Sequence, residues 1–300
     1  TPKPSSAASD VYKRQGSREG GLALVRTAQA RPVPIPVYAE MSSVNPVFIL
    51  PGALHGDVEA LAAGYVQSAT GSSGQLCTQP GVVFVPRGAE GEAFLRAVSE
   101  SLRAATGQTM LSPSIAHAWR DGVATRDENA EVLARGTDGE GPHAPAPVIH
   151  AAELPSFEEN PVLNEEIFGA ASLVVRYGDV AELVEAASRL EGQLTATLQL
   201  SADDHELAAA LLPVLERKVG RILANGWPTG VEVGHAMVHG GPFPATSDSR
   251  TTSVGSLAIE RFLRPVAYQN IPDGLLPEVL RDANPWHVSR LVDGRREVSA

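Results

Sequence analysis

The chain has 300 residues, of which 43% are hydrophobic, 5% aromatic and 20% charged, and its formal net charge is -11 at pH 7. This length allows one large domain or two, with a sizeable core. The acidic balance argues against a nucleic-acid backbone as partner, and the few aromatic side chains argue against base stacking. A single cysteine excludes an internal disulfide framework and a multi-cysteine metal site.

The amino-terminal stretch, residues 1–15, shows no hydrophobic period. Prolines and serines interrupt it, and its last ten residues resemble a translated sequencing adapter. We therefore interpret residues 1–15 as a non-native tail. The sequence contains neither a membrane-spanning apolar run nor a signal peptide, so the expected location is the cytoplasm, without a membrane partner.

From residue 16 onward, strand and helix patterns alternate. Strands are predicted at 32–37, 47–50, 82–85, 148–150, 172–177, 194–200 and 221–227. Helices are predicted at 22–30, 55–70, 91–105, 114–123, 179–190, 203–219 and 256–261. This order predicts an α/β fold with a parallel sheet covered by helices on both faces. A late extended run, residues 262–270, contains a proline and is typical of an edge strand that can pair with another subunit.

The only cysteine, Cys77, lies in a glycine- and proline-bounded connection just before the strand at 82–85. A lone cysteine is a candidate nucleophile, but free cysteines are also often buried for packing, and the residue alone does not decide between these roles. Glu40 closes a strand-like run in apolar company. Burial there would raise its pKa toward a value suited to a general base, whereas a solvated strand end is the plain alternative.

Two histidines, His235 and His239, have the spacing of metal ligands on a helix. Glycines surround them and no third ligand is evident, so we expect no metal site. A cysteine–histidine hydrolase would need a histidine partner for the thiol. His239 is one candidate, with His55, His117 and His150, but no motif supports this reaction.

Four motifs occur in a fixed order: Gly16-Ser17 through Gly21, Glu40 at a strand end, Gly74-Gln75-Leu76-Cys77, and Glu165-Glu166-Ile167-Phe168-Gly169. Together they resemble the second half of the aldehyde dehydrogenase superfamily, from Gly16 to near the carboxyl terminus. Within it, four segments are similar to 2-oxoglutarate semialdehyde (2,5-dioxopentanoate) dehydrogenases. They are residues 39–46, 75–81, 242–247 and 264–270.

The resemblance implies a mechanism. Cys77, as thiolate, would attack the aldehyde to form a thiohemiacetal, with its backbone N–H holding part of the oxyanion. Hydride would pass to NAD or NADP, and Glu40 would activate the water that hydrolyses the thioester.

The resemblance also implies cofactor contacts. Gly16 and Ser17 match the positions that approach the pyrophosphate. Glu166 matches the position that binds the nicotinamide-side ribose, and Phe168 the position that packs on the cofactor.

The family's nucleotide-binding domain precedes the position of Gly16, together with an oxyanion asparagine and an adenosine-binding lysine. We therefore expect this chain to be an amino-terminally truncated fragment that binds cofactor poorly and turns over little. The expected parts are a cofactor-domain remnant at 16–40, a catalytic domain at 41–245, and a return segment with an oligomerisation strand at 246–300. By analogy, the family form is a homo-oligomer, a dimer or tetramer. The alternatives are an NADP-dependent long-chain aldehyde dehydrogenase and a non-catalytic, oligomer-forming fragment.

Overall fold

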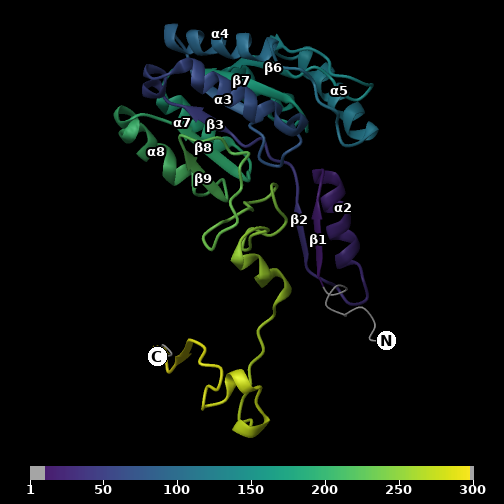
Figure 1. Ribbon diagram of the computed structural model, residues 1–300, viewed down its shortest axis with the longest axis vertical. Coiled ribbons are helices and arrows are strands. Elements are labelled where there is room, and N and C mark those ends of the chain that lie inside the picture. Colours follow the sequence, from purple (N-terminus) through teal and green to yellow (C-terminus); the bar gives the residue numbers. More distant parts are fainter. Residues whose placement is uncertain (1–10, 298–300) are drawn as a thin grey trace. The chain divides into compact units, whose positions relative to one another are not determined.

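The computed structural model describes residues 11–297 (Figure 1). The chain divides into two units, Thr1–Phe262 and Leu263–Ala300. The strands of the first unit are β1 (Tyr12–Gln15), β2 (Val37–Glu40), β3 (Val47–Ile49), β4 (Val82–Pro86), β5 (Glu131–Arg135), β6 (Val148–Glu153), β7 (Ala171–Tyr177), β8 (Thr195–Gln199) and β9 (Arg221–Ala224). Its α-helices are α2 (Arg18–Gln29), α3 (Val58–Thr70), α4 (Ala89–Arg103), α5 (Pro113–Asp127), α6 (Leu154–Glu159), α7 (Val180–Arg189) and α8 (His205–Leu215).

The main sheet has seven strands in the order β5-β6-β7-β4-β3-β8-β9. Every neighbouring pair is parallel except β5 and β6, which are antiparallel with a bulge between Val132 and Ala134. The predicted α/β class with a largely parallel sheet is therefore confirmed. The edge strand β5 was not predicted, because most of its side chains are exposed and it lacks the apolar run of its neighbours.

Helices cover both faces of this sheet, as the sequence predicted (Figure 1). Successive side chains of a strand point to opposite faces. Val47 and Ile49 of β3 therefore join the core formed with α3 and α4, whereas Phe48 of β3 and Leu50 directly after it join the core formed with α6, α7 and α8. All four are fully buried, and each contributes about 1.5–3 kcal/mol through removal from water.

A smaller element, β1-α2-β2, precedes the sheet. β1 and β2 are parallel, with Gln15 opposite Glu40. This differs from the expectation that residues 12–15 lie outside the fold; residues 1–10 lie outside the described residues. The strand predicted at 32–37 begins only at Val37, because three prolines in the run lack the N–H needed for ladder hydrogen bonds.

Two predicted helix starts are confirmed by their caps. The Ser112 hydroxyl accepts a hydrogen bond from the Ile115 N–H, with a proline at the first position of α5. Asp179 and Glu182 form a reciprocal capping box at the start of α7. These caps fix where the chain leaves the sheet and turns into each helix.

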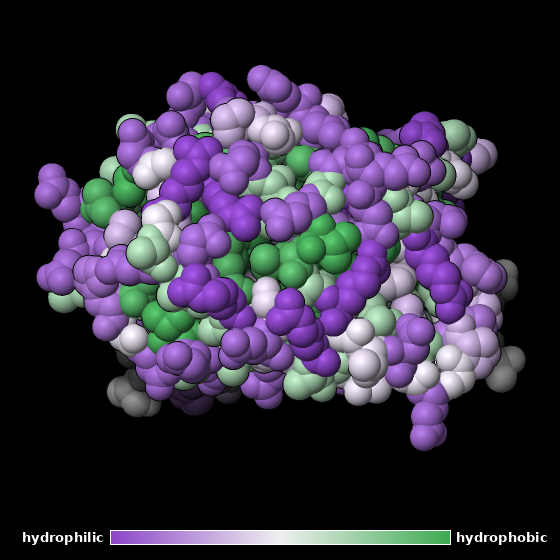
Figure 2. Space-filling model, turned by 90° about the horizontal axis from the view of Figure 1, so that it is seen from above, coloured by the Kyte–Doolittle hydropathy of each residue, from purple (hydrophilic) through white to green (hydrophobic). Residues whose placement is uncertain are grey.

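The second unit holds two short 3-10 turns and a hairpin of β10 (Arg290–Val292) and β11 (Arg295–Glu297). Residues 263–269, where an oligomerisation strand was predicted, are exposed and form no strand within the described chain. Their pairing with a second subunit stays a prediction. In residues 11–297, no helix is both long and apolar enough to cross a membrane. Viewed from the side of α4, the surface is mostly hydrophilic, with hydrophobic side chains gathered near its middle (Figure 2).

Candidate active site

Topology brings the sequence motifs together. Cys77 lies just before β4, residues 41–46 just before β3, and the Glu165–Gly169 segment just before β7. These three strands are neighbours and parallel, so the loops before them lie at the same edge of the sheet. Motifs that are far apart in the sequence therefore lie close together, at the edge of the sheet where β3, β4 and β7 begin.

The backbone around Cys77 is held by Asn45. The Asn45 amide donates to the carbonyls of Cys77 and Gln79, each at 2.9 Å, and its oxygen accepts from the hydroxyls of Ser43 and Thr195. Asn45 is 1% exposed, so these bonds are shielded from water. Within residues 11–297 the Cys77 N–H donates no hydrogen bond to another backbone group.

Gly74 joins the cysteine loop to the loop before β7. Its φ is +64°, and a Cβ placed on it would lie 2.3 Å from the backbone of Gly169 and of Ala170. Only glycine fits this conformation and this contact. The backbone that positions Cys77 thus rests directly on the end of the Glu165–Gly169 segment.

Glu40 ends β2 and is 5% exposed. Its carbonyl accepts a hydrogen bond from the Gly16 N–H at 3.1 Å, and its backbone pairs with Thr246. Ser253 donates its hydroxyl to one carboxylate oxygen at 3.0 Å, and the Gln15 amide donates to the other at 3.4 Å. Residues 15–16, Thr246 and Ser253 therefore fix Glu40, two contacts holding its backbone and two its carboxylate.

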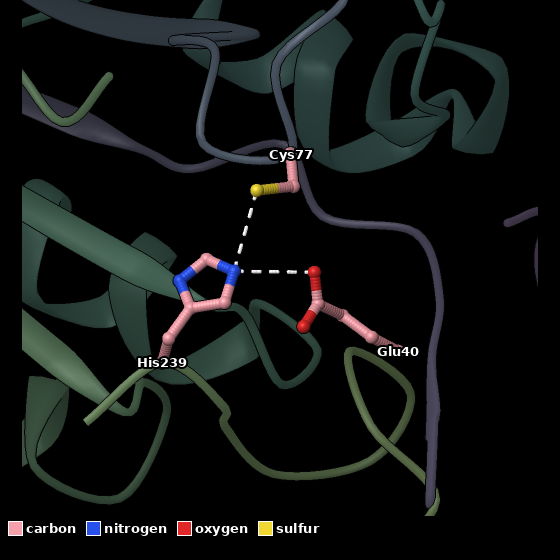
Figure 3. A group of neighbouring side chains, drawn as sticks. All are labelled: Glu40, Cys77 and His239. Carbon is pink, nitrogen blue, oxygen red and sulfur yellow. Dashed lines mark hydrogen bonds and ion pairs between the residues drawn. The ribbon is translucent and has the colours of Figure 1, made fainter. Parts of the chain in front are cut away.

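His239 lies between Cys77 and Glu40 (Figure 3). Its Nε2 is 3.3 Å from the Cys77 Sγ and 3.1 Å from the Glu40 Oε1. The imidazole is buried, 3% exposed, and its backbone N–H donates to the Thr252 hydroxyl. Its Nδ1 has no hydrogen-bond partner in the described chain. The three side chains come from three separate segments and converge on one nitrogen.

The charges of this group reinforce one another. Burial lowers the pKa of His239 because it disfavours a charged imidazole. The hydrogen bonds to Cys77 and Glu40, together with the negative charges of these two groups, have the larger effect and raise the pKa of His239 to about 9. Burial would also raise the pKa of Glu40, yet the bonds from His239, Ser253 and Gln15 lower it overall. The expectation of a raised Glu40 pKa is therefore wrong, because the sequence did not reveal its cationic neighbour.

The predicted cofactor residues Gly16, Ser17 and Glu166 lie near the amino-terminal end of α2. Ser17 caps α2, accepting from the Gly20 N–H at 3.3 Å, and this helix start offers free N–H groups. Glu166 is half-buried; burial raises its pKa to about 8, against a hydrogen bond from the Ser43 backbone and the charge of Arg18.

Phe168 is 39% exposed, so its ring is accessible to a ligand. The segment that carries it is anchored by Arg126, a side chain 2% exposed at the end of α5, which donates a hydrogen bond to the Glu165 carbonyl. An exposed ring, a carboxyl group and the amino terminus of a helix are thus chemically compatible with a nucleotide ligand.

The histidine pair at 235 and 239 does not lie on a helix. His235 is exposed and bonds the Ser256 hydroxyl at 2.8 Å. His239 instead meets Glu40 and Cys77, and the ligand atoms of these three residues all lie within 4.8 Å of one another. The sequence offered His239 as one of four possible partners of Cys77 but could not single it out, because it is 162 residues from Cys77 and 199 from Glu40. Its place beside the motif at 242–247 was the one available signal.

The chain thus combines a largely parallel α/β sheet with a cysteine–histidine–glutamate group in which His239 and Glu40 are buried and Cys77 is half-buried. The chain belongs to the aldehyde dehydrogenase family, whose model matches residues 9–243. The predicted resemblance is thereby confirmed.

Two curated relatives are similar over most of this chain. One, from Azospirillum brasilense, is alpha-ketoglutaric semialdehyde dehydrogenase 2; it is 50% identical over 94% of this chain and 54% of its own length. The other, alpha-ketoglutaric semialdehyde dehydrogenase from Acinetobacter baylyi, is 46% identical over 93% of this chain and 54% of its own. The chain thus spans about half the length of these relatives.

The fold also matches solved structures. A 1-pyrroline-5-carboxylate dehydrogenase from Thermus with bound NAD has a TM-score of 0.66 at 23% identity, covering 79% of this chain and 46% of its own. At this identity the match shows the fold alone.

Proposed function

We propose that this chain supplies the nucleophile and the general base of an NAD(P)-dependent aldehyde dehydrogenase that oxidises 2-oxoglutarate semialdehyde to 2-oxoglutarate. The observation that carries the proposal is the Cys77 Sγ, 3.3 Å from a buried imidazole that is itself 3.1 Å from Glu40, in a chain of this family. The names of both curated relatives support the substrate.

The first step is attack by sulfur. His239, charged near neutral pH, places a positive charge 3.3 Å from the Cys77 Sγ, and the thiolate is the nucleophilic form of a cysteine. Attack on the aldehyde carbon forms a C–S bond, and the carbonyl oxygen becomes an oxyanion for which the Cys77 N–H is the donor. The product of this step is a thiohemiacetal on Cys77.

A bound nicotinamide dinucleotide would accept the hydride that turns the thiohemiacetal into a thioester. Glu166, Phe168 and the start of α2 would hold and orient its nicotinamide end. Glu40 is ionised near neutral pH because its pKa is lowered, so it can take a proton from water. That water attacks the thioester carbon, the C–S bond breaks, and the carboxylic acid leaves with Cys77 restored as thiolate.

We further propose that the chain alone binds cofactor weakly, because only residues for the nicotinamide end are identified in it. Equilibrium dialysis of NAD and NADP against the isolated chain tests this. Micromolar binding would contradict it.

Turnover tests the main proposal, in a protein that joins this chain to the upstream sequence of its source gene. With 2-oxoglutarate semialdehyde and NAD or NADP, we expect steady formation of reduced cofactor, none in Cys77→Ala, and a single burst without turnover in Glu40→Gln. His235→Gln, an exposed histidine outside the site, is the matched control and should behave as wild type. Faster turnover of a long-chain aldehyde would favour that alternative substrate, and a folded protein without turnover would refute the dehydrogenase.

A further inference from the structure

We propose that Cys77, His239 and Glu40 form a Zn²⁺ site whose occupation blocks the thiol. The sulfur, the imidazole nitrogen and the carboxylate oxygen come from different segments and their side chains converge (Figure 3). A thiolate, an imidazole and a carboxylate are the ligands that zinc binds in proteins, and three of them with one water complete a tetrahedral site. The site needs neither cofactor nor aldehyde, so it goes beyond the proposed function.

The distances suit such an ion. Zinc binds sulfur at about 2.3 Å and nitrogen or oxygen at about 2.0–2.2 Å, which separates tetrahedral ligand atoms by roughly 3.3–3.6 Å. The Sγ–Nε2 distance is 3.3 Å and the Nε2–Oε1 distance is 3.1 Å. The remaining pair, Sγ and Oε1, lies within 4.8 Å. Side-chain adjustments of about 1 Å therefore bring all three atoms to one ion.

The orientation and the charge of the three side chains also suit a bound zinc ion. Both contacts of His239 are made by Nε2, so the nitrogen that faces the other two ligands is the one that would bind the ion, and its proton would be released to solvent on binding. The carboxylate of Glu40 is oriented by the Ser253 hydroxyl at 3.0 Å, an outer contact of the kind that positions metal ligands. A thiolate and a carboxylate together balance the two positive charges of the ion.

Occupation has a direct consequence for Cys77. Coordination to zinc draws electron density from the sulfur and crowds it, so the bound thiolate attacks a carbonyl carbon or an alkylating reagent more slowly. Zn²⁺ at this site would therefore inhibit the proposed dehydrogenase reversibly, and removal of the ion by a chelator would restore the thiol.

The test uses the chain itself, with Co²⁺ as the spectroscopic probe for Zn²⁺. Because Cys77 is the only cysteine, a cobalt–thiolate charge-transfer band can arise at no other residue. We expect one Co²⁺ per chain, displaced by Zn²⁺, and slower iodoacetamide labelling of Cys77 when Zn²⁺ is bound. Addition of EDTA should restore the labelling rate.

Variants separate a three-ligand site from a lone thiolate. In His239→Gln and Glu40→Gln the affinity should fall by more than about tenfold, since even outer contacts of a metal site contribute that much. His235→Gln, four residues from His239 and exposed, should bind as wild type does. Circular dichroism checks that each variant folds. If one of the two ligand variants, His239→Gln or Glu40→Gln, does not fold, the other still tests the site. An unchanged affinity in both ligand variants, or labelling that Zn²⁺ does not slow, would overturn the proposal. Neither result depends on dehydrogenase activity.

Discussion

Gly74→Ala should destabilise the protein and loosen the cysteine loop. An alanine at φ +64° costs about 1–2 kcal/mol as left-handed backbone. Its Cβ would also lie 2.3 Å from the backbone of Gly169 and Ala170, and relief of such crowding costs about 1–3 kcal/mol. The atoms near this Cβ belong to the backbone of Gly169 and Ala170, which cannot move aside as a flexible side chain can. We therefore expect the two costs to add to about 3 kcal/mol.

Thermal unfolding measures this effect, with an expected fall in Tm of roughly 5–10 °C. Gly71→Ala is the matched control, because Gly71 lies in the same loop with φ -54° and nothing within 4 Å of an added Cβ. It should change stability by less than about 0.5 kcal/mol. Equal Tm values for the two variants would refute the close contact between the cysteine loop and the segment before β7.

Three further predictions concern the same surroundings. The pKa of His239 is raised from 6.5 to about 9, so its contribution to stability is complete below pH 6.5 and is lost as the pH rises through about 9. The free energy of unfolding should fall by up to about 3 kcal/mol across that window, and a His239→Gln variant with the same slope would contradict this. Arg126→Met removes the donor to the Glu165 carbonyl. Hydrogen exchange of the backbone amides in the Glu165–Gly169 segment, measured by mass spectrometry, should therefore become about tenfold faster. Unchanged exchange would show that Arg126 does not anchor this segment. Asn45→Asp keeps the shape of the side chain but loses two buried N–H donors, one of them to the Cys77 carbonyl. We expect the free energy of unfolding, measured with denaturant, to fall by about 2 kcal/mol. An unchanged free energy would show that Asn45 does not hold the backbone around Cys77.

The sequence predicted most of the sheet and its helices because their apolar periods are strong and their caps are local. Strands with little burial were missed: β5 has mainly exposed side chains, and β10 with β11 forms a hairpin of three-residue strands. An Asp-Gly pair, Asp293 and Gly294, connects these two strands with positive φ at both positions. That dipeptide is a strong hairpin signal and would have allowed the prediction.

In the site, Cys77 and Glu40 were predicted from motifs, and the structure brings them to one histidine. The role of His239 and the direction of the Glu40 pKa shift could not be predicted, because both depend on a contact between segments about 200 residues apart. Local pattern carries no information on such contacts. Burial alone indicated a raised Glu40 pKa, whereas the bonds from His239, Ser253 and Gln15 lower it.

In the proposed mechanism, His239 and Glu40 prepare Cys77 for nucleophilic attack. The most direct measurement is the rate of iodoacetamide labelling of Cys77 at pH 7 in the folded chain and in the same chain unfolded by urea. We expect the folded chain to react faster by about tenfold or more, and the His239→Gln variant to lose most of this advantage. If the folded chain is labelled more slowly than the unfolded one, and His239→Gln does not change the labelling rate, then Cys77 is an inert packing residue and His239 does not activate it.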